Sequence, residues 1–246
     1  MLPYFLKKIR WRLLEKINRR DFNLPQSGPI VSFTFDDFPQ SALRIGGKIL
    51  KDYGICGTYY ASMGLMGQEY STGNQFTAED ISNLIDEGHE LGCHTYSHIS
   101  CRTSFKKFYA DAIKGMEAVS EIIGKETLQS FSYPQGHVNF QSKQWIGKQF
   151  LSCRGIFPGV NKSPVDLNLL RANSLYTWEF DVESINRLFE ENVQSNGWLI
   201  FYTHDISDTP SEYGCKPGEF EKVVDLAVKK RNNILPVNKV LSDSQN

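Results

Sequence analysis

Two adjacent carboxylates, Asp36 and Asp37, close the apolar run at residues 29–35, and two histidines four positions apart, His94 and His98, follow later in the chain. One carboxylate of such a pair can bind a metal ion while the other acts on a coordinated water molecule. Neutral imidazole combined with one carboxylate suits Zn²⁺ and its first-row neighbours better than Mg²⁺ or Ca²⁺, and three protein ligands leave a position open for water. An open position indicates a catalytic metal site rather than a structural one.

Each of these features also has a purely structural explanation. Asp36 and Asp37 could cap the next helix or form a turn, as Asp often does after a strand. The spacing of His94 and His98 could be accidental, and His204, after the run at residues 198–203, could make a hydrogen bond in the core. The chain has only five histidines, however, and three of them follow predicted strands. This distribution favours a site.

The elements that must position these residues alternate between strand-like and helix-like segments, which predicts an α/β fold with parallel strands and helical crossovers. Strands are predicted at residues 30–35, 57–62, 90–93, 129–133, 152–157, 198–202 and 234–237. Helices are predicted at residues 41–51, 77–88, 105–123, 141–150, 182–195 and 219–230. The candidate residues fall just past strand ends, which converge on one face in a β/α barrel. We therefore expect one shared pocket.

Length and composition are those of one catalytic domain, which we place at residues 26–246. A chain of 246 residues with 40% apolar residues can build one sizeable core. The five cysteines lack any close spacing, so the pattern predicts reduced thiols rather than disulfides or a cysteine zinc site.

Residues 1–25 are predicted to form a basic amphipathic helix. Residues 1–22 carry seven Lys or Arg against Glu15 and Asp21, a charge of +5, so the rest of this chain of net charge −1 carries −6. Such a helix either docks on its own domain or lies on an anionic membrane surface. Charges interrupt each apolar run before the roughly 7–15 residues of a secretory signal. We expect a cytoplasmic protein, peripheral to the inner face of the membrane on the second interpretation, with no nucleic-acid partner.

Four segments carry a resemblance to a known family. Residues 34–37 (TFDD), 94–98 (HTYSH), 131–136 (FSYPQG) and 199–204 (LIFYTH) resemble, in order and spacing, the motifs of polysaccharide deacetylases, the NodB-homology or carbohydrate esterase family 4 enzymes. The resemblance implies a distorted (β/α) barrel of about seven parallel strands and a divalent metal, usually Zn²⁺. It also implies hydrolysis of an N-acetyl group on a sugar.

The resemblance assigns roles to individual residues. It makes Asp36 the general base that acts on the metal-bound water, and it makes the metal ligands Asp37, His94 and His98. The backbone N–H of Gln135 would complete an oxyanion site, and His204 would protonate the leaving amine as general acid. The residues predicted to line the substrate pocket are Tyr60, Tyr133, Pro134 and Trp178.

Two departures from the family pattern change the expected site. Ser132 stands where the family usually has an Arg that contacts the catalytic Asp. We predict that Arg171, after Leu169 and Leu170, replaces it through a bidentate contact with Asp36; a surface position is the alternative. The fourth motif is not clear at residues 173–181, where Glu179 or Asp181 could orient His204.

We expect the substrate to be an N-acetylated sugar in a lipid-linked or nucleotide-linked precursor of a surface polysaccharide or glycolipid. Most relatives that trim finished polymers must be exported, whereas this sequence shows no export signal. One alternative is a deformylase, or another hydrolase of non-peptide C–N bonds, on the same site. The other is a metal-binding carbohydrate-recognition protein without turnover, for which the missing Arg is the only support. An open groove would suit a polymer, and a closed pocket would suit a small head group.

Overall fold

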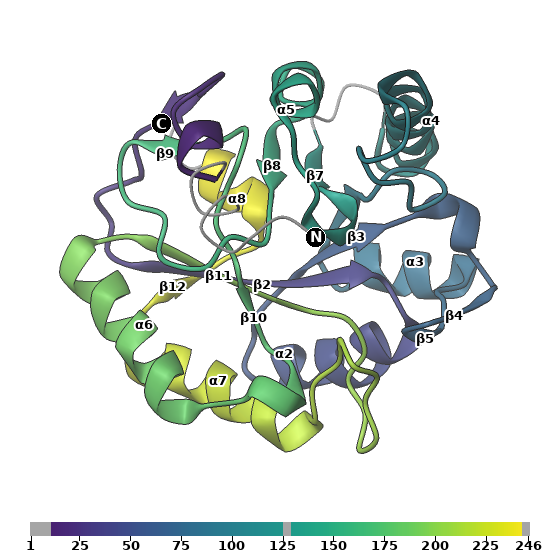
Figure 1. Cartoon of the computed structure of the whole chain (residues 1–246). Helices are drawn as coiled ribbons and strands as arrows, with labels where there is room; N and C mark the ends of the chain where they lie inside the picture. The colour runs from purple at the N-terminus through teal and green to yellow at the C-terminus, as the bar shows by residue number, and fades with distance from the viewer. Residues whose placement is uncertain (1–10, 125–128, 243–246) are drawn as a thin grey trace.

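In the computed structural model, which describes residues 11–124 and 129–242, seven parallel strands form one curved sheet (Figure 1). The strands lie in the order β10 (Asn173–Ser174), β11 (Trp198–Thr203), β2 (Ile30–Asp37), β3 (Thr58–Ala61), β6 (Glu90–Cys93), β7 (Ser130–Ser132) and β8 (Ser152–Arg154). A short strand, β12 (Asn233–Ile234), also pairs with β2. A parallel bridge between Arg154 and Leu170 links β8 to the segment that leads into β10. The sheet is thus a distorted, incompletely closed (β/α) barrel, as predicted.

The helices cover both faces of the curved sheet: α8 (Val237–Ser242) packs on the inner face against Ile30, Trp198 and Ile200, and the others lie around the outside (Figure 1). These others are α2 (Lys48–Asp52), which continues the π-helical segment Ala42–Gly47, α3 (Ala78–Asp86), α4 (Phe105–Ile123), α5 (Phe140–Ile146), α6 (Val182–Ser195) and α7 (Pro217–Lys229). Two antiparallel strand pairs lie apart from the main sheet: β1 (Asp21–Phe22) with β9 (Val165–Asp166), and β4 (Glu69–Tyr70) with β5 (Gly73–Asn74). None of the helices in the described ranges is long and apolar enough to span a membrane.

Local sequence signals explain where several helices begin and end. Thr77 and Asp80 form a reciprocal capping box at the start of α3. The Ser104 hydroxyl accepts a hydrogen bond from the Lys107 N–H at the start of α4, and Gly124 follows its last residue with φ +97°. Asp181 caps α6 by accepting from two backbone N–H groups. The bounds predicted for α4 and α6 are confirmed because caps and periodicity agree there.

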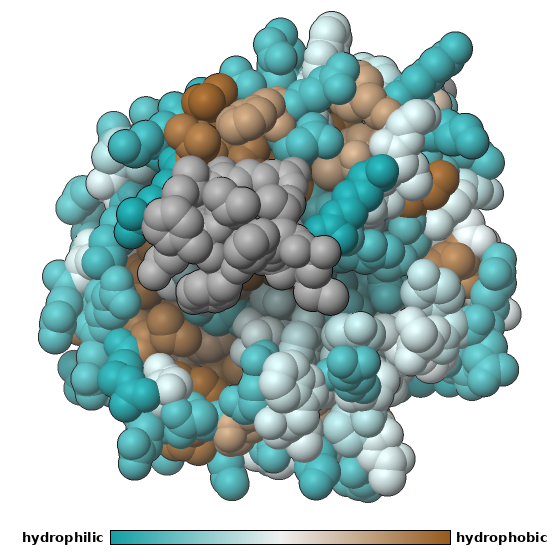
Figure 2. All heavy atoms as spheres, in the orientation of Figure 1, coloured by the Kyte–Doolittle hydropathy of each residue, from teal (hydrophilic) through white to brown (hydrophobic). Residues whose placement is uncertain are grey.

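The core lies on both faces of the sheet, since the strands of a parallel barrel are covered on both sides. All six residues of β11 and all eight of β2 are buried. An aromatic group around Phe35 fills the space between β2 and α7: its ring lies 4.6 Å from that of Tyr59 and 5.6 Å from that of Phe220. The outer surface visible in Figure 2 is hydrophilic over most of its area, with apolar patches between the polar residues.

The described part of the N-terminal segment, residues 11–22, packs against the barrel. Leu14 is 2% exposed within a core cluster, and the Trp11 ring stacks on Phe157 at 5.0 Å. The buried ammonium of Lys143 donates to the carbonyl oxygens of Leu14 and Ile17 at 2.5 and 2.7 Å. This is the arrangement that the docking interpretation expects. Residues 1–10 lie outside the described ranges, so the membrane interpretation and the division at residue 25 stay predictions.

The last predicted strand is wrong in its bounds. Residues 234–237 were expected to form the last strand, but β12 stops at Ile234 and Val237 already begins α8. Pro236 separates them, and the residue before a proline avoids the helical region. Five further strands of two residues each were not predicted: β1, β4, β5, β9 and β10.

Candidate active site

Both carboxylates of the Asp36-Asp37 pair line one cavity of about 320 Å³, which we call the catalytic cavity. Adjacent side chains of a regular strand point to opposite faces. Here Asp37 and Phe38 have φ +63° and +62°, which ends the regular pleat and allows both carboxylates to reach the same space. Asp tolerates this left-handed conformation better than most residues. His98 and Gln135, which also line the cavity, share it, and so does Thr95 beside His94.

The Asp37 carboxylate and two imidazoles form a group with the geometry of a metal site. The Nε2 atoms of His98 and His94 lie 3.3 and 3.7 Å from Asp37 Oδ1, and the three candidate ligand atoms all lie within 4.8 Å of one another. The buried Oδ1 atom of Asp37 accepts no hydrogen bond from any described residue. A buried carboxylate oxygen without a donor is costly unless a cation lies against it.

The second nitrogen of each imidazole is fixed by a neighbour. Nδ1 of His94 lies 2.8 Å from the Ser132 carbonyl oxygen, which requires an N–H at Nδ1 and leaves the lone pair on Nε2. Nδ1 of His98 lies 3.0 Å from the Tyr70 hydroxyl, on the β4–β5 hairpin. Burial lowers the pKa of His94 to about 4, so this imidazole is neutral at neutral pH. A neutral, oriented His94, an oriented His98 and the Asp37 carboxylate fit a divalent metal, and these three residues would hold it.

Asp36 lies beside this group and pairs with Arg154, a residue that the sequence analysis did not single out. The Arg154 guanidinium donates to Asp36 and, at 2.5 Å, to the Ser132 hydroxyl, while the rings of Tyr60 and Tyr202 lie 5.2 and 4.9 Å from its carbon. Burial alone would raise the pKa of Asp36, but the positive charge of Arg154, together with His94 and His204, lowers it to about 2. Asp36 is therefore an ionised acceptor across the neutral range.

His204 approaches the cavity from the loop after β11. Its Nδ1 atom lies 3.2 Å from the Tyr213 carbonyl oxygen, which fixes the ring. The two acids considered as its partners bind elsewhere: Glu179 accepts from the Ser174 hydroxyl, and Asp181 caps α6. A backbone carbonyl rather than a carboxylate therefore orients His204.

The turn after β7 places Gln135 and Gly136 in the wall of the catalytic cavity. Gly136 has φ +61°, and a Cβ atom at this position would lie 2.2 Å from Ile156. Only glycine fits this close approach. The turn thereby brings the backbone of Gln135 to the cavity, as an oxyanion site requires.

The sequence comparisons identify the family. The family model described as polysaccharide deacetylase matches residues 23–149, which is more than half of the chain. The chain belongs to the polysaccharide deacetylase family. The resemblance seen in its four motifs is confirmed. No similar sequence was found among curated proteins.

Solved structures of deacetylases and esterases share the fold. PdaA of Bacillus subtilis, a family 4 carbohydrate esterase, has a TM-score of 0.60 and 10% identity over 95% of this chain and 89% of its own. The Bc1960 peptidoglycan N-acetylglucosamine deacetylase has a TM-score of 0.59 and 17% identity over 94% and 96%. A family 4 acetyl xylan esterase from Clostridium thermocellum with bound cobalt has a TM-score of 0.57 and 14% identity over 87% and 90%. These likenesses confirm the barrel.

One departure from the family pattern is resolved differently from our prediction. The proposal that Arg171 contacts Asp36 is wrong: its guanidinium binds Glu15 and the Pro158 carbonyl oxygen. Arg154, at the end of β8, makes the contact instead. The predicted strand at residues 152–157 was too long, so Arg154 was expected within the strand. In the structure β8 ends at Arg154, which places this residue at the catalytic edge of the sheet. The following Gly155 was the available signal for that strand end.

The predicted pocket lining is also corrected. Tyr60 packs behind Arg154, and the Tyr133 hydroxyl lies 3.3 Å from the Asn168 carbonyl oxygen, away from the cavity. Trp178 is 66% exposed, and Pro134 is buried at the start of its turn. The side chains that line the cavity in their place are Tyr70, Ile156, Tyr176, Tyr202 and Tyr213. Tyr202 comes from β11, within the motif at residues 199–204, and the others come from hairpin and loop segments without a local motif, so only the fold brings them together.

Proposed function

We propose that this polysaccharide deacetylase family member is a divalent-metal-dependent hydrolase that removes the N-acetyl group of an aminosugar. The observation that carries the proposal is the junction of Asp37, His94 and His98 with Asp36 and His204 around one cavity. Two imidazoles and one carboxylate suit Zn²⁺. When bound, such an ion acts as a Lewis acid and lowers the pKa of water towards about 7.

The residues of the chain divide the proton transfers between them. Asp36, held by Arg154, accepts the proton of the attacking water as its oxygen adds to the amide carbon. The backbone N–H of Gln135 donates to the carbonyl oxygen, which gains negative charge. His204 gives a proton to the nitrogen as the C–N bond breaks, so that acetate and a free amine leave.

The shape of the catalytic cavity supports a small substrate unit. Its volume of about 320 Å³ is near the lower end of the range for ligand pockets, and tyrosine rings form much of its wall. We propose one N-acetylated sugar of a lipid-linked or nucleotide-linked precursor as the substrate. The cytoplasmic location, at the inner face of the membrane or free of it, stays a prediction.

The experiment combines metal analysis with acetate release. Purified protein is assayed on chitooligosaccharides and on an N-acetylated sugar nucleotide, with N-formyl analogues in parallel for the deformylase alternative. Asp36→Asn should keep the metal and lose turnover, whereas His98→Ala should lose the metal. The opposite pattern, or no acetate release from any substrate by fully metallated protein, would overturn the proposal.

The alternative without turnover loses its support, because Arg154 makes the contact with Asp36 that the missing Arg was expected to make.

A further inference from the structure

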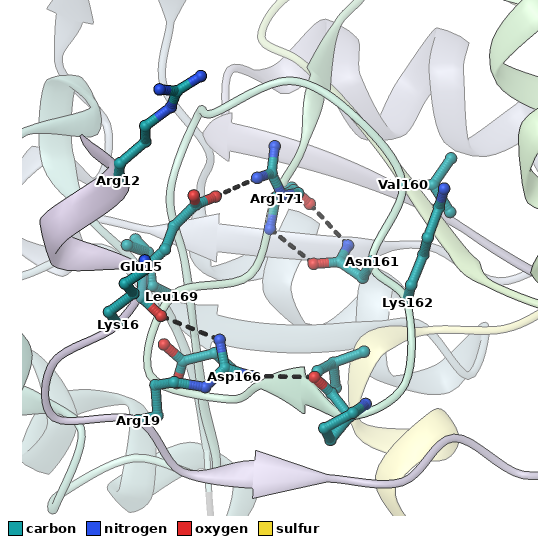
Figure 3. A pocket seen from close by; sticks show the side chains of 12 residues that line it. Arg12, Glu15, Lys16, Arg19, Val160, Asn161, Lys162, Asp166, Leu169 and Arg171 are labelled. Carbon is teal, nitrogen blue, oxygen red and sulfur yellow. Dashed lines mark hydrogen bonds and ion pairs between the residues drawn. The ribbon is translucent and has the colours of Figure 1, made fainter. Parts of the chain in front are cut away.

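A second cavity, of about 540 Å³, lies between the N-terminal segment and the connection from β8 to β10 (Figure 3). We call it the basic cavity. Five cationic side chains line it against two carboxylates, an excess of three positive charges in a chain whose net charge is −1. The cations are Arg12, Lys16, Arg19, Lys162 and Arg171, and the carboxylates are Glu15 and Asp166.

The two carboxylates are already used. The buried ammonium of Lys143 lies 2.5 Å from Asp166, and Glu15 accepts from Arg171. Arg12 and Lys16 make no ion pair with any other residue in the described ranges, and Figure 3 shows that the Arg12 guanidinium makes no contact with the other labelled side chains. Of the other cations, Arg19 pairs with Asp21 at 2.7 Å and Lys162 pairs with Glu191 at 2.8 Å. The positive charges without an acidic partner among the described residues are therefore those of Arg12 and Lys16.

A third cavity of the same protein shows that this imbalance is not general. That cavity, of about 390 Å³, is lined by three cations and three acids. Arg44 pairs with Asp80 at 2.9 Å, Lys51 with Glu87 at 2.6 Å, and Lys48 with Asp52 at 3.0 Å. Every cation there has an acidic partner, so that cavity gives no reason to expect an anion.

Arg171 lines the basic cavity, and its guanidinium is fixed by three contacts. One Nη1 N–H donates to the Pro158 carbonyl oxygen at 2.7 Å and one Nη2 N–H donates to Glu15, so three of its five N–H groups have no acceptor among the described residues. Its guanidinium also lies 4.5 Å from the centre of the Phe157 ring. A guanidinium fixed in this way loses little freedom on binding and suits the paired oxygens of phosphate groups.

From these observations we infer that the basic cavity binds a diphosphate group, supplied either by a nucleotide or by a lipid-linked compound. A diphosphate ester carries about two negative charges and several acceptor oxygens, which match the unpaired cations and the free donors of Arg171. The cavity volume leaves space for more than the diphosphate itself. Because Ile156 lines the catalytic cavity and its neighbours Phe157 and Pro158 hold Arg171, one segment supports both sites. The inference does not depend on the deacetylase reaction.

Calorimetric titration with inorganic pyrophosphate at low ionic strength tests the inference. The wild-type protein should bind it, and Arg12→Gln/Lys16→Gln should weaken binding by about tenfold, since each exposed charge pair contributes modestly. The matched control is Lys106→Gln/Lys107→Gln, two exposed lysines without ion pairs on α4, which should leave the affinity unchanged. His98→Ala should also leave it unchanged, which separates the basic cavity from pyrophosphate bound to a metal.

Three results would overturn the inference: no binding by the wild type, an equal loss in both double variants, or a loss that occurs only in His98→Ala. Parallel titrations identify the source of the diphosphate. Tighter binding of uridine diphosphate than of pyrophosphate would indicate a nucleotide, and tighter binding of geranyl diphosphate would indicate a lipid-linked compound. Equal affinities would show that the cavity recognises the diphosphate alone.

Discussion

The catalytic cavity and the basic cavity both contain an arginine paired with a carboxylate, but the two pairs differ in solvent access. The side chains of Arg154 and Asp36 are 0% and 5% exposed, whereas those of Arg171 and Glu15 are 31% and 26% exposed. A buried charge without its partner has no water to replace that partner, while a partly exposed charge does. Each pair joins an arginine to a carboxylate, so burial decides what each arginine contributes.

This difference suits the two cavities to different tasks. In the catalytic cavity, the neighbours of Asp36 hold it in one position and one charge state. In the basic cavity, cations at the rim stay hydrated and can exchange water for an incoming anion. Rigid buried charges serve a reaction that needs one geometry, and exposed charges serve binding that salt can modulate.

The largest effect should come from Arg154→Met, which leaves the Asp36 carboxylate buried without its partner. We expect a loss of about 3–5 kcal/mol in the free energy of unfolding, the usual cost of breaking a buried pair. Turnover should fall as well, because Asp36 loses the group that orients it. Urea unfolding and acetate release measure the two losses.

A double variant provides the control. Asp36→Asn/Arg154→Met removes both charges and should recover much of the lost stability, although it stays inactive. A single Arg154→Met variant as stable as the wild type would contradict the assigned role of burial.

His204→Ala should have the next largest effect and should act on turnover alone. His204 lies at the mouth of the catalytic cavity with its ring held by a backbone carbonyl, so its removal breaks no buried ion pair. As general acid it should contribute about 10²–10⁴-fold to the rate. Metal content and the unfolding midpoint should not change. Activity equal to that of the wild type would show that another group protonates the amine.

Tyr70→Phe should have a smaller effect, confined to metal binding. The Tyr70 hydroxyl lies 3.0 Å from Nδ1 of His98 and fixes the imidazole that would hold the metal. Loss of a hydrogen bond to a metal-binding imidazole usually weakens metal binding by about 10–100-fold, and for a neutral partner we expect the lower figure. Competition with a chelator measures this affinity. Tyr213→Phe, in the same cavity, is the matched control. In the described residues the Tyr213 hydroxyl makes no hydrogen bond to His94 or His98, and its ring lies beside His204 instead.

The sequence predicted the parts of this site that depend on strand ends with clear apolar patterns. The runs at residues 29–35 and 198–203 are buried strands in both prediction and structure, so Asp36, Asp37 and His204 were placed at the correct edge. The helices predicted at residues 105–123 and 182–195 also match the structure. Local patterns suffice where one segment decides the position.

The parts that failed depend on which segments become neighbours. Arg154 lies within a predicted strand and Arg171 follows a strand-like stretch. Only the pairing of β8 with β7 brings Arg154 beside Ser132 and close to Asp36. Arg171 instead meets Glu15, from a turn more than a hundred residues earlier in the chain. The tyrosines of the pocket wall likewise converge from four separate segments. No local pattern records such contacts.

The smallest effect should come from Arg171→Met, the counterpart of Arg154→Met in the basic cavity. Its ion pair with Glu15 is partly solvated, and its contact with Phe157 should contribute about 0.5–1 kcal/mol. We therefore expect a loss of about 1–2 kcal/mol in the free energy of unfolding, clearly below that of Arg154→Met. Added salt should reduce this difference from the wild type, because it screens exposed pairs more than buried ones. Urea unfolding of both methionine variants at two salt concentrations makes the comparison. Equal losses for the two variants would mean that solvent access does not separate these two arginines.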